Sequence, residues 1–105
     1  IEISTEGVEV EAAEFNSEPV VERAIGYQEI LDSLSREIFV PLDTRSDGEH
    51  YGTTVRAARG GSIPGAIHVE YVNNLDEQGC YKPANDLRSM YERAGVMPEQ
   101  TIACY

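Results

Sequence analysis

The chain alternates twice between an amphipathic helical pattern and a short apolar segment of strand length, and this alternation constrains its fold more than any other feature. Apolar residues at helical spacing predict two helices, each with one buried side. The first helix is expected to end near Arg36, and the second to begin near Pro83 and stop at Gly95. The apolar positions are Tyr27, Ile30, Leu31 and Leu34 in the first helix and Leu87, Met90, Tyr91 and Ala94 in the second.

Three short apolar segments predict strands. They span residues 38–42, 66–69 and 101–105. Because Pro41 cannot donate a ladder hydrogen bond, we expect the first regular strand to be short and to fray toward Asp43. Helices that alternate with continuous apolar strands are typical of an α/β fold, in which helices flank a parallel sheet.

The carboxyl ends of parallel strands form the usual site of such a sheet. The three predicted ends are Asp43-Thr44-Arg45, Glu70-Tyr71 and Tyr105. We therefore expect these residues to converge. The segments beside them are a turn or single helical turn at 46–52 and long loops at 53–64 and 72–81, and long ordered loops in compact domains tend to be functional.

The chain has room for one domain, because 105 residues can bury only one core. Every charged residue from Ile1 to Glu22 is acidic, and this segment lacks helical periodicity. We expect residues 1–19 to form an acidic linker or wrapping arm and residues 20–105 to form the domain. Since the first residue is isoleucine, we also expect the chain to be cut from a longer protein.

The charge balance excludes two classes of partner. Eight Lys and Arg against nineteen Asp and Glu give a net charge of -11, which argues against binding to nucleic acid or to an anionic membrane. No apolar run approaches the roughly 20 residues of a membrane span, and no basic and apolar leader is present. Two cysteines are too few for a disulfide framework, so we expect a cytoplasmic protein with reduced thiols.

Three ordered motifs surround the first predicted strand end and the loop before the second strand: Asp43-Thr44-Arg45, Glu49-His50-Tyr51-Gly52 and Gly61-Ser62-Ile63-Pro64-Gly65-Ala66. Their order and spacing resemble the rhodanese family, and most of all the second, catalytic domain of tandem thiosulfate or 3-mercaptopyruvate sulfurtransferases. The resemblance runs from about Val20 to Tyr105. It departs at Ser62, where the family usually has histidine, and at Glu49, where vertebrate thiosulfate sulfurtransferases have a substrate-binding arginine and many bacterial members have glutamate.

The resemblance implies a rhodanese-like sheet that is incomplete at its C terminus. It also implies that the nucleophile is a cysteine directly after Tyr105, so that no catalytic residue lies within the chain and the fragment alone is inactive. Backbone N–H groups of the following loop and helix would stabilise its thiolate and persulfide. The implied substrates are thiosulfate or 3-mercaptopyruvate as a small anionic sulfur donor, and a thiol or cyanide as acceptor. The implied partners are the missing remainder of the domain and, as a further candidate, a second rhodanese domain.

The candidate residues for the pocket or for support of its loop are Asp43, Arg45, Arg59, Ser62 and Tyr105. Asp43 and Arg45 follow a strand directly, where they can form a charge pair or bond the backbone of the loop. Arg59, together with Arg56, brings positive charge to the long loop of an otherwise acidic chain. Both arginines are therefore pocket candidates.

The cysteines and histidines within the chain receive structural interpretations. Strand alternation predicts that Cys104 is a buried thiol, and Cys80 has no cationic neighbour nearer than Lys82. His50 is expected to be solvated in a polar turn, and His68 to be a hydrogen-bonded core or edge residue. No Cys and His cluster has the spacing of a metal site, so we expect no metal and no cofactor.

Two alternatives remain open at the level of sequence. One is a non-catalytic rhodanese-like module for binding or support, which would carry the same Asp43, Arg45 and Gly-rich loop. The other is a related dual-specificity phosphatase of the cell cycle, whose active-site loop is one residue longer. The residue after Tyr105 and the length of the loop that follows it separate these alternatives from a sulfurtransferase.

Overall fold

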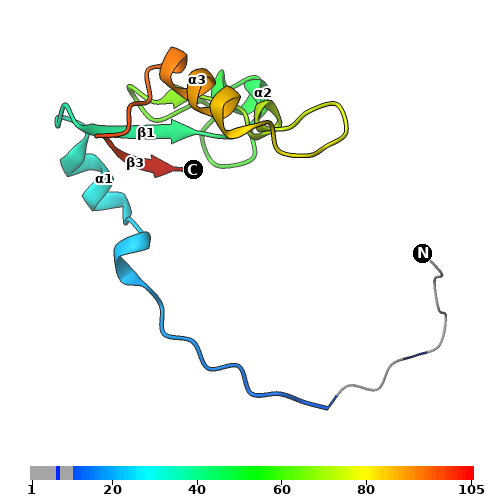
Figure 1. The fold of residues 1–105 in the computed structure, drawn as a ribbon. Helices are drawn as coiled ribbons and strands as arrows, with labels where there is room; N and C mark the ends of the chain where they lie inside the picture. Colours follow the sequence, from blue (N-terminus) through cyan, green and yellow to red (C-terminus); the bar gives the residue numbers. More distant parts are fainter. Residues whose placement is uncertain (1–6, 8–10) are drawn as a thin grey trace.

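The computed structural model describes Gly7 and residues 11–105 of the chain. Its strands run parallel in the order β2-β1-β3, with β1 at Phe39–Asp43, β2 at Ile67–His68 and β3 at Thr101–Cys104. The helices are α1 (Tyr27–Ser33), α2 (Asp47–His50) and α3 (Ala84–Ala94), with 3₁₀ helices at Val21–Arg23 and Tyr71–Asn74. In Figure 1, α2 and α3 lie on one side of the sheet and α1 lies on the other. The predicted α/β fold with a parallel sheet flanked by helices is confirmed.

The central strand β1 contains a proline, and its pairing explains why. β1 pairs with β3 from Phe39 to Leu42, but with β2 only at Leu42 and Asp43. Leu42 and Thr44 bond toward β3, and because alternate residues point their backbone groups to opposite sides, Pro41 faces β2. Since β2 starts to pair at Leu42, the missing N–H of Pro41 removes no ladder hydrogen bond. The prediction that the strand frays toward Asp43 was therefore wrong.

The core is centred on β1. All five residues of this strand are buried. The buried hydrophobic side chains are Phe39, Val40 and Leu42 of β1 and Val69, which follows β2. A strand that is covered on both faces needs a continuous apolar run instead of an alternating one, and the sequence around Val40 supplies it.

Helix α1 is shorter and more exposed than its pattern predicts. It ends at Ser33, three residues before Arg36, and Ser33 is its only buried residue. Tyr27 is 75% exposed and Leu31 is 45% exposed. Figure 1 shows α1 beneath the start of β1, so only part of the helix covers the sheet. The prediction of a helix was right, but the prediction that its whole apolar stripe is buried was wrong.

Local signals determine the limits of the other two helices. Ser46 and Glu49 form a reciprocal capping box at the start of α2, in which each side chain satisfies a backbone N–H of the first turn. Helix α3 begins directly after Pro83 and ends directly before Gly95, as predicted. The predicted turn or single helical turn at 46–52 therefore contains one short helix.

The N-terminal segment lies apart from the sheet. Residues 11–20 form no regular secondary structure, and all of them are exposed. In Figure 1 this segment runs away from the folded part. The linker or arm expected at 1–19 lies partly outside the described residues and stays a prediction.

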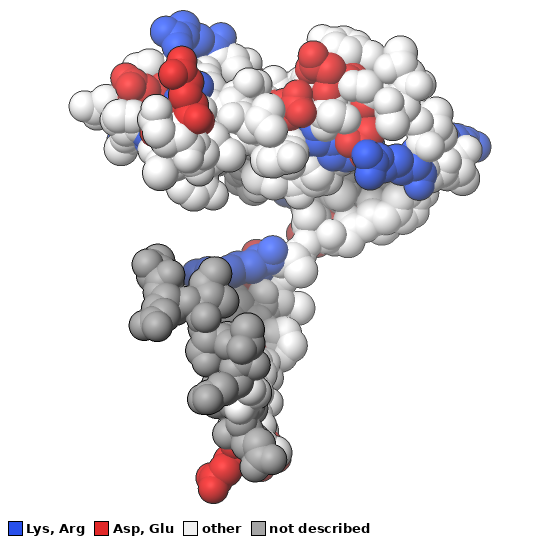
Figure 2. All heavy atoms as spheres, turned by 90° about the vertical axis from the view of Figure 1, so that its right-hand side faces the viewer, with Lys and Arg blue, Asp and Glu red and all other residues white. Residues whose placement is uncertain are grey.

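The face at the carboxyl ends of the strands carries both signs of charge. Figure 2 views the molecule from the right-hand side of Figure 1, toward which β1 and β3 point, and basic and acidic side chains lie next to one another there. The described residues visible on this face form no continuous basic area of the kind that binds nucleic acid. Within the described ranges, no helix is long and apolar enough to cross a membrane.

Two glycines with nearly the same backbone conformation test how closely the loops pack. Gly52 has φ 77°, and an added Cβ would lie 3.1 Å from the backbone nitrogen of Gly61. Gly65 has φ 79° and no heavy atom within 4 Å of such a Cβ. We expect Gly65→Ala to lower the free energy of unfolding by about 1 kcal/mol and Gly52→Ala by about 2–3 kcal/mol, because the contact adds to the backbone strain. Urea denaturation followed by circular dichroism measures both, and equal losses would contradict the close packing.

Candidate active-site wall at the strand ends

Backbone hydrogen bonds join the ends of the three strands. The N–H of Val69 donates to Asp43 O, and the N–H of Tyr71 donates to Thr44 O, both at 3.0 Å. Thr44 donates twice to Tyr105 O, from its N–H at 3.0 Å and from Oγ1 at 2.9 Å. The predicted convergence of the strand ends is confirmed. Thr44, which the sequence did not single out, is the residue that holds the end of β3.

Asp43 lies beneath Arg45 as a fully buried carboxylate, with 0% of its surface exposed. Arg45 forms a fork on it, with Nε 2.9 Å from Oδ1 and Nη2 2.7 Å from Oδ2. The backbone N–H of Arg45 adds a third bond to Oδ1 at 3.1 Å. A planar guanidinium held at two nitrogens has little freedom to turn. Asp43 therefore fixes the direction in which Arg45 points.

The charges of this pair are stabilised where they stand. Burial by itself would raise the pKa of Asp43, but hydrogen bonds from the side chain of Arg45, from His50 and from the backbone of Arg45 hold that pKa far below its usual value. The hydrogen bond to Asp43 raises the pKa of Arg45 above its ordinary value. Both groups are ionised at neutral pH, so the pair is a fixed dipole below the loop.

Arg45 and Tyr105 attach the Gly-rich loop, residues 59–66, to the sheet. Arg45 Nη2 also donates to Gly61 O at 3.0 Å, and its guanidinium carbon lies 4.9 Å from the centre of the Tyr105 ring. The Tyr105 hydroxyl accepts a hydrogen bond from the N–H of Ile63 at 2.9 Å. Burial is the main reason that the pKa of Tyr105 is raised. Because these contacts engage Gly61 and Ile63, the loop is held at two points on either side of Ser62.

The two histidines pack against this pair. His50 Nδ1 lies 3.0 Å from Asp43 Oδ2, and His68 Nε2 lies 2.9 Å from Arg45 O. Each side chain is only 13% exposed. The prediction that His50 is solvated was wrong, because α2 turns its ring back onto the buried carboxylate. The prediction that His68 is a hydrogen-bonded core or edge residue is confirmed.

A cavity of about 430 Å³ lies beside the pair. Its lining residues are Thr44, Arg45, Ser46, Glu49, Arg56, Glu70 and Tyr71. A hydrogen bond from Ser46 is the main cause that lowers the pKa of Glu49, and Arg56 Nε lies 3.5 Å from its carboxylate. Glu49 is thus occupied by the helix cap and by an arginine. The cavity presents two cations and two carboxylates to a ligand.

The remaining predicted residues lie outside the network. Arg59 and Ser62 are exposed on the Gly-rich loop. Cys80 and Cys104 are free and exposed. The prediction of a buried Cys104 was wrong, because β3 is an edge strand of the described sheet and its first and last residues face solvent.

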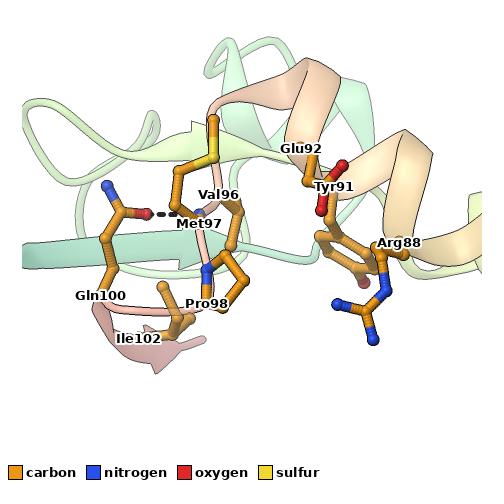
Figure 3. A pocket seen from close by; sticks show the side chains of 8 residues that line it. All are labelled: Arg88, Tyr91, Glu92, Val96, Met97, Pro98, Gln100 and Ile102. Atoms are coloured by element: carbon orange, nitrogen blue, oxygen red, sulfur yellow. Dashed lines mark hydrogen bonds between the residues drawn. The ribbon is translucent and has the colours of Figure 1, made fainter.

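A second cavity of about 370 Å³ lies between α3 and β3, away from the strand ends (Figure 3). Its lining residues are Arg88, Tyr91, Glu92, Val96, Met97, Pro98, Gln100 and Ile102. Gln100 accepts a hydrogen bond from the N–H of Met97 at its rim. None of the predicted pocket residues lies here. Within Gly7 and 11–105, no group of three His, Cys, Asp or Glu residues could hold a metal ion.

The fold and these contacts define a class: an α/β protein with a charged pair and a braced Gly-rich loop at the carboxyl ends of parallel strands. The chain is 33% identical over 63 residues to a thiosulfate sulfurtransferase of Azotobacter vinelandii. This match covers 60% of this chain and 23% of that protein. It is also 26% identical over 73 residues to human 3-mercaptopyruvate sulfurtransferase, and this match covers 67% of this chain and 25% of that protein. No protein-family model matches the chain.

The fold is also found among solved structures. An anaerobic ergothioneine biosynthesis enzyme from Chlorobium limicola matches with a TM-score of 0.71 and 22% identity, over 80% of this chain and 22% of that one. The chain is therefore a homologue of the rhodanese-type sulfurtransferases, with their α/β fold. Its matched part spans about a quarter of the length of these curated relatives.

Removing the charge of Asp43 tests the role of the buried pair. We expect Asp43→Asn to lower the free energy of unfolding by about 2–4 kcal/mol, because Arg45 then loses its anionic partner in a partly buried place. Asp32→Asn is the matched control, since Asp32 is exposed on α1 and bonds only Gln28 among the described residues. Its effect should stay within about 0.5 kcal/mol. Chemical denaturation measures both, and similar small losses would contradict a structural role for the pair.

The lowered pKa of Asp43 predicts a dependence of stability on pH. An unfolded chain protonates aspartate near pH 3.9, whereas folded Asp43 stays ionised to lower pH. Its contribution to stability is therefore complete above about pH 4 and is lost as the pH falls toward the lower folded pKa. We expect the free energy of unfolding to fall more steeply below about pH 4 in the wild type than in Asp43→Asn. Parallel curves in denaturation experiments across this range would refute the prediction.

Proposed function

We propose that the chain is part of a sulfurtransferase domain, equivalent to the second, catalytic domain of a tandem thiosulfate or 3-mercaptopyruvate sulfurtransferase. The observation that carries this proposal is the attachment of the Gly-rich loop to the end of β3 through Arg45 and Tyr105. Those contacts lie directly before the position at which the resemblance to the rhodanese family implies a nucleophilic cysteine. The sulfurtransferases that the chain matches support the same class of reaction.

The proposed reaction passes sulfur through that cysteine, after Tyr105. Its thiolate attacks the outer sulfur of thiosulfate, so that a new S–S bond forms while the S–S bond of the donor breaks and sulfite leaves with the electron pair. Cyanide carbon, or a thiolate, then attacks the outer sulfur of the persulfide and the cysteine thiolate is released. With 3-mercaptopyruvate the C–S bond breaks instead, and the pyruvate carbanion takes up a proton.

The residues of this chain would act in this reaction by positioning the groups that react. Asp43 and Arg45 hold the loop, and Tyr105 places the backbone from which the cysteine follows. Arg59 and Ser62, exposed on the same loop, are the residues we propose to face the anionic donor. Arg56 would reduce the repulsion between Glu49 and an anionic donor, because the arginine pairs with the glutamate carboxylate.

The wider setting is proposed on the same basis. The remainder of the domain would cover the exposed edge of β3, and a second rhodanese domain would lie next to it in the complete protein. A cytoplasmic location would keep the nucleophile reduced, which the reaction requires. The substrates would be a small anionic sulfur donor and a cyanide or thiol acceptor.

Sulfur transfer by the full-length protein tests the proposal. We expect thiocyanate to form from cyanide with thiosulfate or 3-mercaptopyruvate as donor, and a mass increase of about 32 Da after donor alone, the mass of one sulfur atom retained as a persulfide. Replacing the cysteine after Tyr105 with serine should abolish both signals, because the serine oxygen cannot form a persulfide. Gln28→Ala, far from the strand ends on α1, should leave both unchanged.

Two results would separate this function from its alternatives. A residue other than cysteine after Tyr105, or a cysteine that takes up no sulfur from either donor, would sink the sulfurtransferase and favour a non-catalytic module. Release of phosphate from a phosphotyrosine substrate without persulfide formation would favour the phosphatase.

A further inference from the structure

The two histidines form a stacked pair beside the buried ion pair. Their ring centres are 4.2 Å apart and the ring planes differ by 6°. Tyr51 packs edge-on against His50, with ring centres 4.9 Å apart. The stacked rings connect α2, which contains His50, to β2, which contains His68. Nothing in the proposed reaction requires these rings, so their arrangement needs a separate explanation.

The partners of the rings fix which nitrogen carries the proton. His50 Nδ1 faces a carboxylate oxygen of Asp43, and a carboxylate that is ionised can only accept, so Nδ1 is the donor. His68 Nε2 faces the backbone oxygen of Arg45, which also only accepts, so Nε2 is the donor. The other nitrogen of His68 lies 3.5 Å from a carboxylate oxygen of the exposed Asp47, a longer contact than either of these.

One of these hydrogen bonds is made to the backbone of Arg45, and the other is made to the carboxylate of Asp43 that binds the Arg45 side chain. His68 holds the backbone oxygen of Arg45, and His50 holds the carboxylate oxygen Oδ2 that also binds Arg45 Nη2. The same Nη2 reaches Gly61 O. A shift of either ring would therefore move the group that braces the Gly-rich loop.

We propose that His50 and His68 are positioning residues whose hydrogen-bond donors fix Arg45, and through Arg45 fix the Gly-rich loop and Tyr105. The stack keeps two hydrogen-bond donors in register, one for the backbone and one for the side-chain partner of the same arginine. This inference depends on the proposed function only for its consequence on turnover. The bracing of the loop is a property of the folded chain, whether or not sulfur is transferred.

Paired substitutions separate the hydrogen-bond donors from the rings. Asparagine at position 50 and glutamine at position 68 place an amide N–H near the donor nitrogen of the histidine, so His50→Asn and His68→Gln keep the donor and lose the ring. His50→Phe and His68→Phe keep a ring and lose the donor. The readout is hydrogen exchange at the N–H of Ile63, which bonds the Tyr105 hydroxyl and reports whether the loop is held.

We expect the protection factor of the Ile63 N–H, measured by NMR in the full-length protein, to fall about ten- to hundredfold in the phenylalanine variants, since each loses a hydrogen bond. The donor-keeping variants should recover most of it. Gln28→Ala on α1 is the control and should leave Ile63 unchanged. Unchanged protection in both phenylalanine variants, or equal losses in both kinds of variant, would overturn the proposal.

The ¹⁵N shifts of the wild-type rings provide a test that does not need a folded variant. We expect a proton on Nδ1 of His50 and on Nε2 of His68, and a bare nitrogen at either position contradicts the assigned contacts. Sulfur transfer, measured in the same variants, separates the two proposals. Lost protection in the phenylalanine variants, together with a wild type that transfers no sulfur, leaves the positioning role intact and removes the proposed function. Full turnover in a phenylalanine variant whose loop has lost protection removes only the consequence for catalysis.

Discussion

The bond between Asp43 and Arg45 is the contact on which the site depends. A carboxylate with no exposed surface is costly unless its charge is paired, and here two side-chain nitrogens of one arginine, a backbone N–H and a histidine all donate to it. Once the arginine is fixed, it carries the loop at Gly61 and faces the Tyr105 ring. The Gly-rich loop therefore has a defined position with very little apolar burial of its own.

The position of the pair follows from the topology of the sheet. Parallel strands direct their carboxyl ends to one edge, so residues distant in sequence meet there without a long connecting structure. Thr44 joins β1 to Tyr105. The backbone that follows β2 donates hydrogen bonds to Asp43 and Thr44 at the end of the central strand. The chain is strongly acidic, yet at this edge Arg45 and Arg56 are each paired with a carboxylate, so the local charge is set by contacts and not by composition.

Much of the fold could be predicted because its signals are local. The 3.6-residue period of α3, its proline start and its glycine stop, and the continuous apolar run of β1 were each sufficient to place an element. The wrong predictions concern residues whose environment depends on the neighbouring strands of the sheet. Pro41 fits the central strand because β2 starts pairing one residue later, and Cys104 is exposed because β3 is an edge strand of the described sheet. Neither fact is a property of the residue or of its sequence neighbours.

The sequence by itself determined the α/β class, the order of the elements, and the residues Asp43, Arg45 and Tyr105, because periodicity, capping residues and a motif at a strand end are all short-range patterns. Only the tertiary structure decided the partners of those residues: Arg45 with Gly61, Tyr105 with Ile63, and His50 stacked on His68. Those contacts join residues as many as 42 positions apart. They depend on strand order and on the path of the loop, which emerge when the sheet assembles and have no counterpart in local sequence.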